Sequence, residues 1–157
     1  MSEDELLEVL EEFETVSEIK EFFENNCKSK ALKPFELTLL KEAKKSYQSK
    51  KNYIHDIRVK DIQAFNNSSY DNKTPMYIIN HAQNTDNALK AYMNNPESLI
   101  ESNSREKLSF LLVQDKEGND QYFLEVQGNH RVLILLILSD VCEELCLNDV
   151  EVTKLIS

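Results

Sequence analysis

The stretch Gln127-Gly128-Asn129-His130-Arg131 lies where a predicted strand, 122–126, gives way to a predicted helix. Gly128 is one of only two glycines in the chain, which indicates a backbone position that needs a positive φ or the close approach of a partner. A strand, a turn and a helix start direct backbone N–H groups and the positive end of the helix dipole to one place. His130 and Arg131 add polar and charged groups there. The stretch therefore predicts a site for a phosphate or carboxylate group.

The length and composition are those of a globular chain. Its 157 residues are 41% hydrophobic and 29% charged, which suits one domain with a substantial core. No run approaches the roughly 18 apolar residues of a membrane span, and the first residues lack the pattern of a signal peptide. Three cysteines without a framework spacing fit a reducing compartment. We therefore expect a cytoplasmic protein that does not associate with membranes.

The charge is strongly negative but unevenly distributed. A net charge of -10 disfavours nonspecific binding to nucleic acid, which depends on neutralising phosphates with basic side chains. Residues 1–26 carry ten acidic side chains and one lysine, whereas residues 27–60 carry ten basic and three acidic side chains. Two interpretations stay open: the two segments form helices with complementary faces, or the basic segment presents a face to a phosphate-bearing partner.

The first third of the chain is predicted to be helical. An apolar stripe at helical spacing predicts a helix over 3–14, with acidic residues in its first turn. Ser17 is the predicted N-cap of a second, short helix. Pro34 is the predicted first residue of a third helix that runs to about Ser46.

The middle of the chain mixes both kinds of element. Residues 53–59 have the β-branched and aromatic content of a strand, and 63–73 are rich in asparagine and serine, which is typical of a loop. Thr74-Pro75 has the cap-then-proline pattern of a helix start, and Asn95-Pro96 repeats the signal for a short helix. Thr85 is the predicted cap of a helix between these two.

The last third changes to a strand pattern. The largely apolar runs 108–113 and 122–126 predict a β-hairpin with a loop of several residues. Apolar residues at spacings of three and four then favour a helix over 132–147, stopped by Asn148. Residues 150–156 are the predicted closing strand.

This order of elements resembles the ParB and sulfiredoxin superfamily. Its members commonly carry a strand, Gly-x-(His or Arg)-Arg, a helix and a short strand, and Gly128-Asn129-His130-Arg131 matches that motif. Residues 54–62 are similar to the strand that opens the fold, with its trailing isoleucine. The resemblance implies an α+β fold, a small mixed sheet with packed helices, over 53–157. Residues 1–52 would be a helical N-terminal extension.

The resemblance also implies a ligand. In this superfamily the motif loop and the following helix start bind nucleotide phosphates: CTP in ParB partition proteins, and ATP or ADP in sulfiredoxins and free-serine kinases. By that resemblance Gly128, Asn129, His130 and Arg131 would form the phosphate cradle for a nucleoside triphosphate, CTP or ATP. Hydrolysis or transfer of a phosphate with Mg²⁺ is a further expectation.

The chain departs from the superfamily in three respects. Asn129 stands where sulfiredoxins have their catalytic cysteine, which argues against repair of cysteine sulfinic acid. Residues 53–157 contain no counterpart of the DNA-binding helix-turn-helix that follows the fold in partition proteins, so we expect a stand-alone, divergent member. The bulky residues 132–135 replace a start of the helix that is usually alanine-rich, and they either crowd the nucleotide site or serve a different packing.

The candidates for catalysis are few and weak. Phosphoryl transfer needs a carboxylate that activates the nucleophile or holds Mg²⁺, and Glu125, Asp56 and Asp61 are the candidates nearest to the motif. Each of them also fits a solvated strand residue. His130 is a candidate general acid or phosphate ligand, or a residue that simply caps or packs. Arg131 is equally suited to a structural ion pair with Glu125 or Asp56.

Cys142 and Cys146 lie four residues apart on the predicted last helix. With no second pair of cysteines or histidines at metal-ligand spacing, we interpret them as core residues and expect no metal site in the protein itself.

Two other functions stay open. One is a non-catalytic interaction or regulatory protein that docks a protein partner through its acidic helical N-terminus. The other is a small DNA-binding protein or nuclease, which the negative charge and the missing helix-turn-helix disfavour.

Overall fold

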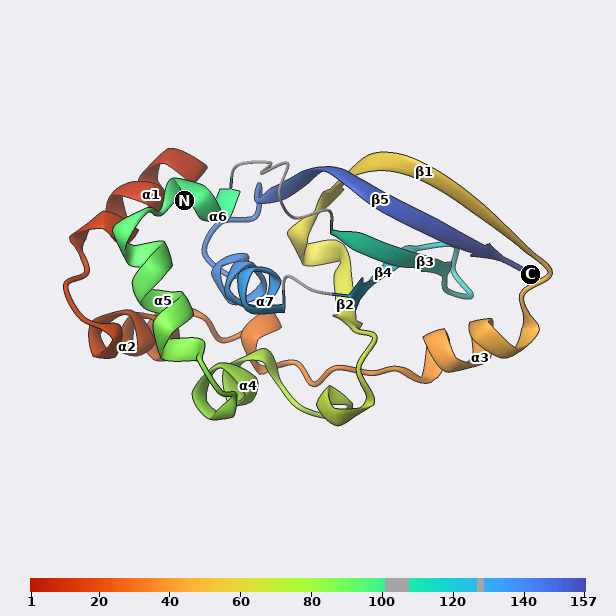
Figure 1. Ribbon diagram of the computed structural model, residues 1–157, viewed down its shortest axis with the longest axis horizontal. Coiled ribbons are helices and arrows are strands. Elements are labelled where there is room, and N and C mark those ends of the chain that lie inside the picture. Colours follow the sequence, from red (N-terminus) through yellow and green to blue (C-terminus); the bar gives the residue numbers. More distant parts are fainter. Residues whose placement is uncertain (101–107, 127–128) are drawn as a thin grey trace.

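The computed structural model describes all residues except 101–107 and 127–128, and it shows an α+β fold with a helical N-terminal region (Figure 1). The helices are α1 (Glu3–Glu12), α2 (Val16–Asn26), α3 (Thr38–Ser46), α4 (Pro75–His81), α5 (Thr85–Asn94), α6 (Glu97–Ile100) and α7 (Asn129–Leu138). The 3₁₀ helices are η1 (Lys30–Leu32), η2 (Val59–Asp61) and η3 (Ser68–Tyr70). The strands are β1 (Ser49–Arg58), β2 (Ile62–Phe65), β3 (Ser109–Gln114), β4 (Asp120–Val126) and β5 (Cys146–Ile156).

The five strands form one mixed sheet in the order β1-β5-β3-β4-β2. The predicted hairpin is confirmed as the antiparallel pair of β3 and β4, while β5 runs parallel to β3 and β2 runs parallel to β4. β1 and β5 form a long antiparallel ribbon that extends away from α1, α2 and α5, with α3 and the C-terminus near its tip (Figure 1). The side chains of β1 are mostly exposed, because this edge strand has little of the protein against either face.

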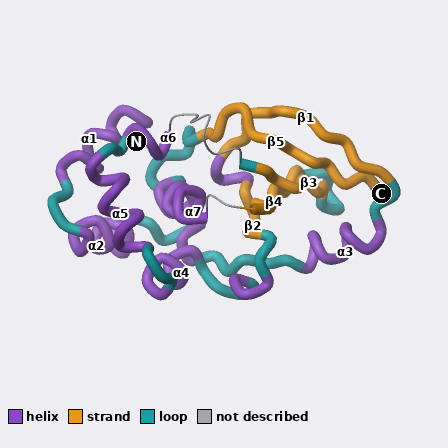
Figure 2. The backbone as a smooth tube through the Cα atoms, viewed as in Figure 1, coloured by secondary structure: helices purple, strands orange, loops and turns teal. Residues whose placement is uncertain are grey.

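Helix α7 lies between the helical group and the sheet (Figures 1 and 2). Each residue from Val132 to Leu138 is at most 1% exposed. An all-apolar helix needs apolar neighbours on every side, and α4, α5 and η1 contact it together with η2, which leads into β2. Among the described residues, no helix is long and apolar enough to cross a membrane.

The N-terminal helices supply part of this cover. Leu6 of α1 and Phe23 of α2 are fully buried, and they belong to the same hydrophobic cluster as the α7 side chains. Residues on both sides of the expected boundary at 52/53 therefore share one core, and β1 itself crosses that boundary. The acidic residues of the two helices remain on their outer faces.

The N-caps of α2 and α5 differ from the prediction. Thr15, rather than Ser17, caps α2, because Thr15 and Glu18 form a reciprocal capping box: the Glu18 N–H donates to Thr15 Oγ1 at 3.2 Å, and the Thr15 N–H donates to Glu18 Oε1 at 3.1 Å. Thr85 is the first residue of α5 rather than its cap, a position held by Asn84 with φ 63°. The predicted starts at Thr74-Pro75 and Asn95-Pro96 are confirmed by α4 and α6.

The third helix begins at Thr38, and Pro34 lies outside it. The preceding backbone bonds to a distant loop instead of to a helical turn. The Phe35 N–H donates to the Lys73 carbonyl at 2.9 Å, and the Leu37 N–H donates to Asp71 Oδ1 at 3.3 Å. These long-range bonds hold the segment extended until Thr38.

The predicted strands extend beyond their expected limits, most of all β1 and β5, and one strand, β2, was not predicted. β1 begins at Ser49 because it pairs with the whole length of β5, from the register Ser49↔Ile156 onward. β2 occupies part of the predicted loop 63–73, since pairing with β4 makes a strand of residues whose local composition favours a loop.

Helix α7 ends at Leu138, nine residues before the predicted end at 147. Turns follow it, and Ser139 Oγ donates to the Leu136 carbonyl at 2.6 Å. Cys142 is buried in this turn region and Cys146 is the first residue of β5, so the two cysteines do not share a helical face. Asn148, the predicted stop, lies inside β5.

Asp140 explains why the chain turns there. Its carboxylate accepts hydrogen bonds from three backbone N–H groups in and before η1: Ser29 at 3.1 Å, Lys30 at 2.7 Å and Ala31 at 3.0 Å. A carboxylate at the start of a helical turn satisfies N–H groups that lack a partner within the turn. Asp140 thus joins the end of α7 to a segment about 110 residues earlier in the chain.

Replacing Asp140 with alanine is expected to lower the free energy of unfolding by about 2–4 kcal/mol, because three partly enclosed N–H groups lose a charged acceptor. Urea denaturation measures the change. Glu143→Ala is the matched control: it removes an exposed carboxylate from the same turn region and should cost no more than about 0.5 kcal/mol. Equal losses in the two variants would contradict the anchoring role of Asp140.

Candidate functional site

The predicted motif lies at a strand–helix junction, as expected. β4 ends at Val126 and α7 begins at Asn129. Gly128 lies outside the described residues, and the side chain of Asn129 is likewise outside the description. The described part of the motif therefore consists of the start of α7 with the side chains of His130 and Arg131.

The junction is located at the carboxyl ends of two parallel strands. β2 and β4 run side by side, with Phe65 in register with Leu124, and the Asn66 N–H donates to the Leu124 carbonyl at 2.7 Å. Ligands of open α/β sheets bind at such carboxyl ends. Lys44 of α3 adds a positive charge near the end of β2, because its Nζ donates to Asn66 Oδ1 at 2.8 Å.

His130 is half-buried in the first turn of α7. Its Nε2 lies 3.2 Å from the carbonyl oxygen of Gln83, in the connection between α4 and α5. With the proton on Nε2, the ring donates to this carbonyl and leaves Nδ1 as an acceptor. A fully protonated imidazolium would instead offer Nδ1–H as a second donor, to an anion for example.

Arg131 is 5% exposed, and its Nε donates to the carbonyl oxygen of Leu99 at 2.9 Å. This bond ties the first turn of α7 to α6. The side chain is therefore buried, and the predicted contact of Arg131 with a phosphate stays a prediction. Residue type alone indicates a charge but not the direction of the side chain, and no local signal in the sequence marks α6 as the partner.

The three carboxylates are dispersed over the sheet. Glu125 is exposed on β4, near the junction. Asp61 forms an ion pair with Arg58, its Oδ2 lying 3.2 Å from Nε, and it precedes β2 at the opposite end of the parallel pair. Asp56 lies on β1, where Oδ1 accepts from the Asp149 N–H at 2.9 Å, and two strands separate β1 from β4. Within the described part of the chain, no group of three or more His, Cys, Asp or Glu residues could hold a metal ion.

The structure has a second candidate site, a cleft whose position could not be predicted from the sequence. A cleft of about 650 Å³ lies at the amino ends of β2 and β4, opposite the junction. Basic side chains contribute much of its lining, together with amides and two carboxylates: Lys30, Lys33, Arg58, Lys60, Gln63, Asn119, Gln121, Asp61 and Asp120. We call it the basic cleft. The excess of basic residues over 27–60 was the sequence signal for it, although the contributions of the β3–β4 turn are visible only in the fold.

Lys30 is the most enclosed of these cations. Burial, reinforced by the neighbouring charge of Lys33, lowers the pKa of Lys30 to about 8, although Asp61 and Asp140 act in the opposite direction. The ammonium group is thus held in a place where its charge is costly.

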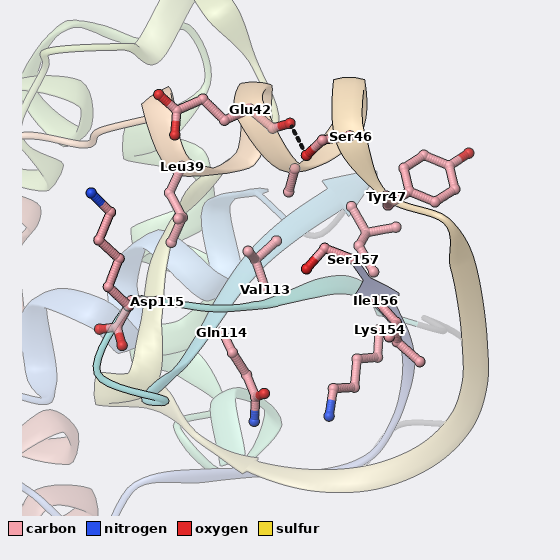
Figure 3. Close-up of a pocket in the computed structure, with 13 residues that line it drawn as sticks. Leu39, Glu42, Ser46, Tyr47, Val113, Gln114, Asp115, Lys154, Ile156 and Ser157 are labelled. Atoms are coloured by element: carbon pink, nitrogen blue, oxygen red, sulfur yellow. Dashed lines mark hydrogen bonds between the residues drawn. The ribbon is translucent and has the colours of Figure 1, made fainter.

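A third hollow, a groove of about 490 Å³, lies under α3 (Figure 3). Leu39 of α3, Val113 of β3 and Ile156 of β5 supply apolar lining. On the helix side, Ser46 Oγ donates to the Glu42 carbonyl at 2.9 Å. Two side-chain carboxylates and two lysines in its lining balance in charge, whereas basic residues outnumber carboxylates in the basic cleft.

The ion pairs bear on the uneven charge of the sequence. Lys20 pairs with Asp86 at 2.8 Å, Lys41 with Asp71 at 3.2 Å, and Lys60 approaches Glu143 at 3.8 Å. Outside 101–107 and 127–128, no ion pair joins the acidic segment 1–26 to the basic segment 27–60. Direct pairing between the two segments therefore does not account for the basic residues.

Among the described residues, the strand–helix junction and the basic cleft both gather groups suited to an anion. Neither of them is defined by a known relative. Comparison with protein-family models, curated proteins and solved structures finds no match for this chain.

Proposed function

We propose that the protein binds the phosphate groups of a nucleotide at the junction between β4 and α7. The observation that carries this proposal is the position of the first turn of α7. It follows β4 at the carboxyl ends of the parallel strands β2 and β4, where a helix start and two strand ends converge.

Electrostatics favour an anion at this place. The N-terminus of a helix carries roughly half a positive charge, concentrated on its unbonded N–H groups. Helix α7 lies in the core, where solvent screens its dipole less than at the surface. His130 lies in this first turn of α7, and Lys44 adds a positive charge beside Asn66, the residue after β2.

Arg131 has a positioning role in this proposal. Its bond to the Leu99 carbonyl fixes the first turn of α7 against α6. Removal of the guanidinium would leave a buried carbonyl without this donor, so Arg131 variants would report on folding as much as on ligand binding.

Hydrolysis or phosphoryl transfer is a finer form of the proposal. Mg²⁺ usually takes one or two protein carboxylates together with the phosphates of its nucleotide. Glu125 lies near the end of β4 and would serve as that ligand or as the base that activates the nucleophile. CTP and ATP are the nucleotides that the resemblance to the ParB and sulfiredoxin superfamily suggests.

A second candidate function rests on the outer surface of the N-terminal helices. The apolar stripes of α1 and α2 face the core, and the exposed side carries acidic residues such as Glu8, Glu11 and Glu21. A protein partner that docks there would need a basic surface. This docking function requires no nucleotide. A nucleotide-binding experiment therefore separates it from the function proposed for the junction.

We expect one of CTP, ATP, GTP or ADP, with or without Mg²⁺, to raise Tm in a thermal-shift assay. Saturation at 100 times Kd stabilises a protein by about 2.7 kcal/mol, or about 5–10 °C for a domain of this size. His130→Ala should remove most of this shift while leaving the Tm of the ligand-free protein within a few degrees of the wild type. His55→Ala, on the exposed edge strand β1, is the matched control and should retain the full shift.

The absence of a shift with all four nucleotides would refute the proposal and favour the docking function. A shift that His130→Ala and His55→Ala reduce equally would show binding elsewhere on the protein.

Lys44→Met is expected to weaken nucleotide binding by about threefold to tenfold, because it removes a partly screened charge near the carboxyl end of β2. Lys45→Met removes an exposed lysine from the next position of α3 and should change the affinity by less than about twofold. Calorimetric titration of the tightest-binding nucleotide measures both. A larger effect of Lys45→Met would place the phosphates away from β2.

A further inference from the structure

The basic cleft is a second site for an anion, separate from the strand–helix junction. It lies where β2 and β4 begin, whereas the junction lies where β4 ends. Its walls come from the region around η1, from the end of β1 with η2, and from the turn between β3 and β4. A ligand there would contact segments that are far apart in the sequence.

Lys30 is held in the cleft without a direct ion-pair partner. The described residues place no carboxylate oxygen within 4.0 Å of its ammonium nitrogen, and they supply no acceptor for it. Lys33 adds a like charge nearby. The lysine is half-buried, and an ammonium group set beside another cation is stabilised when an anion binds.

The other charges leave the cleft positive. Arg58 is engaged by Asp61, and Lys60 approaches Glu143 only to 3.8 Å. Four basic side chains thus face two carboxylates, Asp61 and Asp120, for a net charge of about +2 in a protein whose net charge is -10. This sign is opposite to that of the whole chain and matches a dianion such as a phosphate monoester.

The walls of the cleft are fixed before a ligand arrives. The Lys30 backbone N–H is bound to Asp140 at 2.7 Å, which sets the position from which the side chain extends. Across the cleft, Asp115 Oδ1 accepts from the N–H groups of Glu117 at 3.0 Å and Asn119 at 2.8 Å, which orders the turn between β3 and β4. A preorganised site loses less conformational entropy on binding.

The remaining lining restricts the rest of the ligand. Gln63, Asn119 and Gln121 offer amide donors and acceptors, which suit hydroxyl groups. The described residues of the lining include no aromatic side chain on which a nucleobase could stack. The chemistry therefore fits a phosphate group attached to a hydroxylated carbon chain or ring better than it fits a nucleotide.

We propose that the basic cleft binds a small phosphorylated sugar or polyol, with Lys30 and Lys33 contacting the phosphate and the amides of Asn119 and Gln121 contacting the hydroxyl groups. This inference does not depend on nucleotide binding at the junction.

Calorimetric titration of the full chain with ribose 5-phosphate tests the proposal, with ribose and an equal ionic strength of sodium chloride as controls. We expect saturable binding of the phosphorylated sugar alone. Lys30→Met keeps the length of the side chain and should weaken binding about tenfold or more, as expected for the loss of a charge-assisted hydrogen bond. Lys28→Met removes an exposed lysine outside the cleft and should change the affinity by less than about twofold.

Lys33→Met provides a second variant at an exposed position, which should fold normally and weaken binding severalfold. Urea denaturation confirms that each variant is folded. His130→Ala should bind ribose 5-phosphate as the wild type does, which separates this site from the junction. Any one of three results would overturn the inference: no saturable binding by the folded wild type, equal binding of ribose, or equal losses in Lys28→Met and Lys33→Met.

The pH dependence of the affinity for inorganic sulfate is an independent test of the contact between Lys30 and the anion. Sulfate stays a dianion from about pH 7 to about pH 9, so a change in affinity reflects the protein. The charges that act on Lys30 are Lys33, Asp61 and Asp140, and Arg58, Lys60 and Asp120 complete the charged lining. Because the pKa of Lys30 in the ligand-free protein is about 8, its positive charge is lost as the pH rises through that value. Sulfate affinity should therefore fall between about pH 7 and pH 9 in the wild type, and this fall should be much smaller in Lys30→Met. The same dependence in both proteins would contradict a contact between Lys30 and the anion.

The ligand-free protein provides a further check. The folded pKa of Lys30 lies below its unfolded value, so the unfolded chain binds more protons between about pH 8 and pH 10. This residue therefore makes the free energy of unfolding rise with pH through that window. Lys30→Met should show a smaller rise, and an unchanged rise would mean that the lysine is not held in the environment described.

Discussion

The burial of α7 is the constraint on which the rest of the structure depends. A helix whose residues Val132–Leu138 are all apolar cannot leave a side in water, so the sheet alone cannot cover it. Helices α4 and α5 contact it directly, and α1 and α2 pack behind them against α5. Apolar residues of 1–52 belong to the same hydrophobic cluster as the rest of the chain. Removing the N-terminal helices would therefore expose the outer layer of this core.

Both ends of α7 are held by polar contacts with distant segments. At its start, Arg131 donates to Leu99 and His130 contacts Gln83, so the first turn is bound to two parts of the helical layer. Just past its end, Asp140 binds the backbone before and within η1. Hydrogen bonds are directional, so these contacts at both ends add to side-chain packing in fixing the register of α7. The two candidate sites are consequences of this arrangement, since the junction lies at the start of α7 and the basic cleft includes the segment that Asp140 holds.

The candidate site was partly predictable. The position of the motif between a strand and a helix followed from local signals, namely a glycine, a break in the apolar pattern and the helical spacing beyond it. The contacts of its side chains could not be predicted from these local signals. Arg131 donates to a carbonyl of α6. Asp56 lies away from the junction because two strands separate β1 from β4, and Asp61 does so because it precedes β2, at the opposite end of the parallel pair. The basic segment 27–60 indicated an anion-binding face, but the turn between β3 and β4 joins that face only in the folded chain.

The sequence by itself determined the α+β class, the hairpin, the apolar helix after it and the starts of α4 and α6, because each depends on residues within a few positions of one another. The tertiary structure decided where α3 begins, where α7 ends and that β2 is a strand. Those outcomes depend on contacts such as Phe35 with Lys73 and Asp140 with Lys30, whose partners lie far away in the chain. Local propensities differ by a fraction of a kcal/mol per residue, while a charged or buried hydrogen bond contributes one or more, so the distant partner prevails.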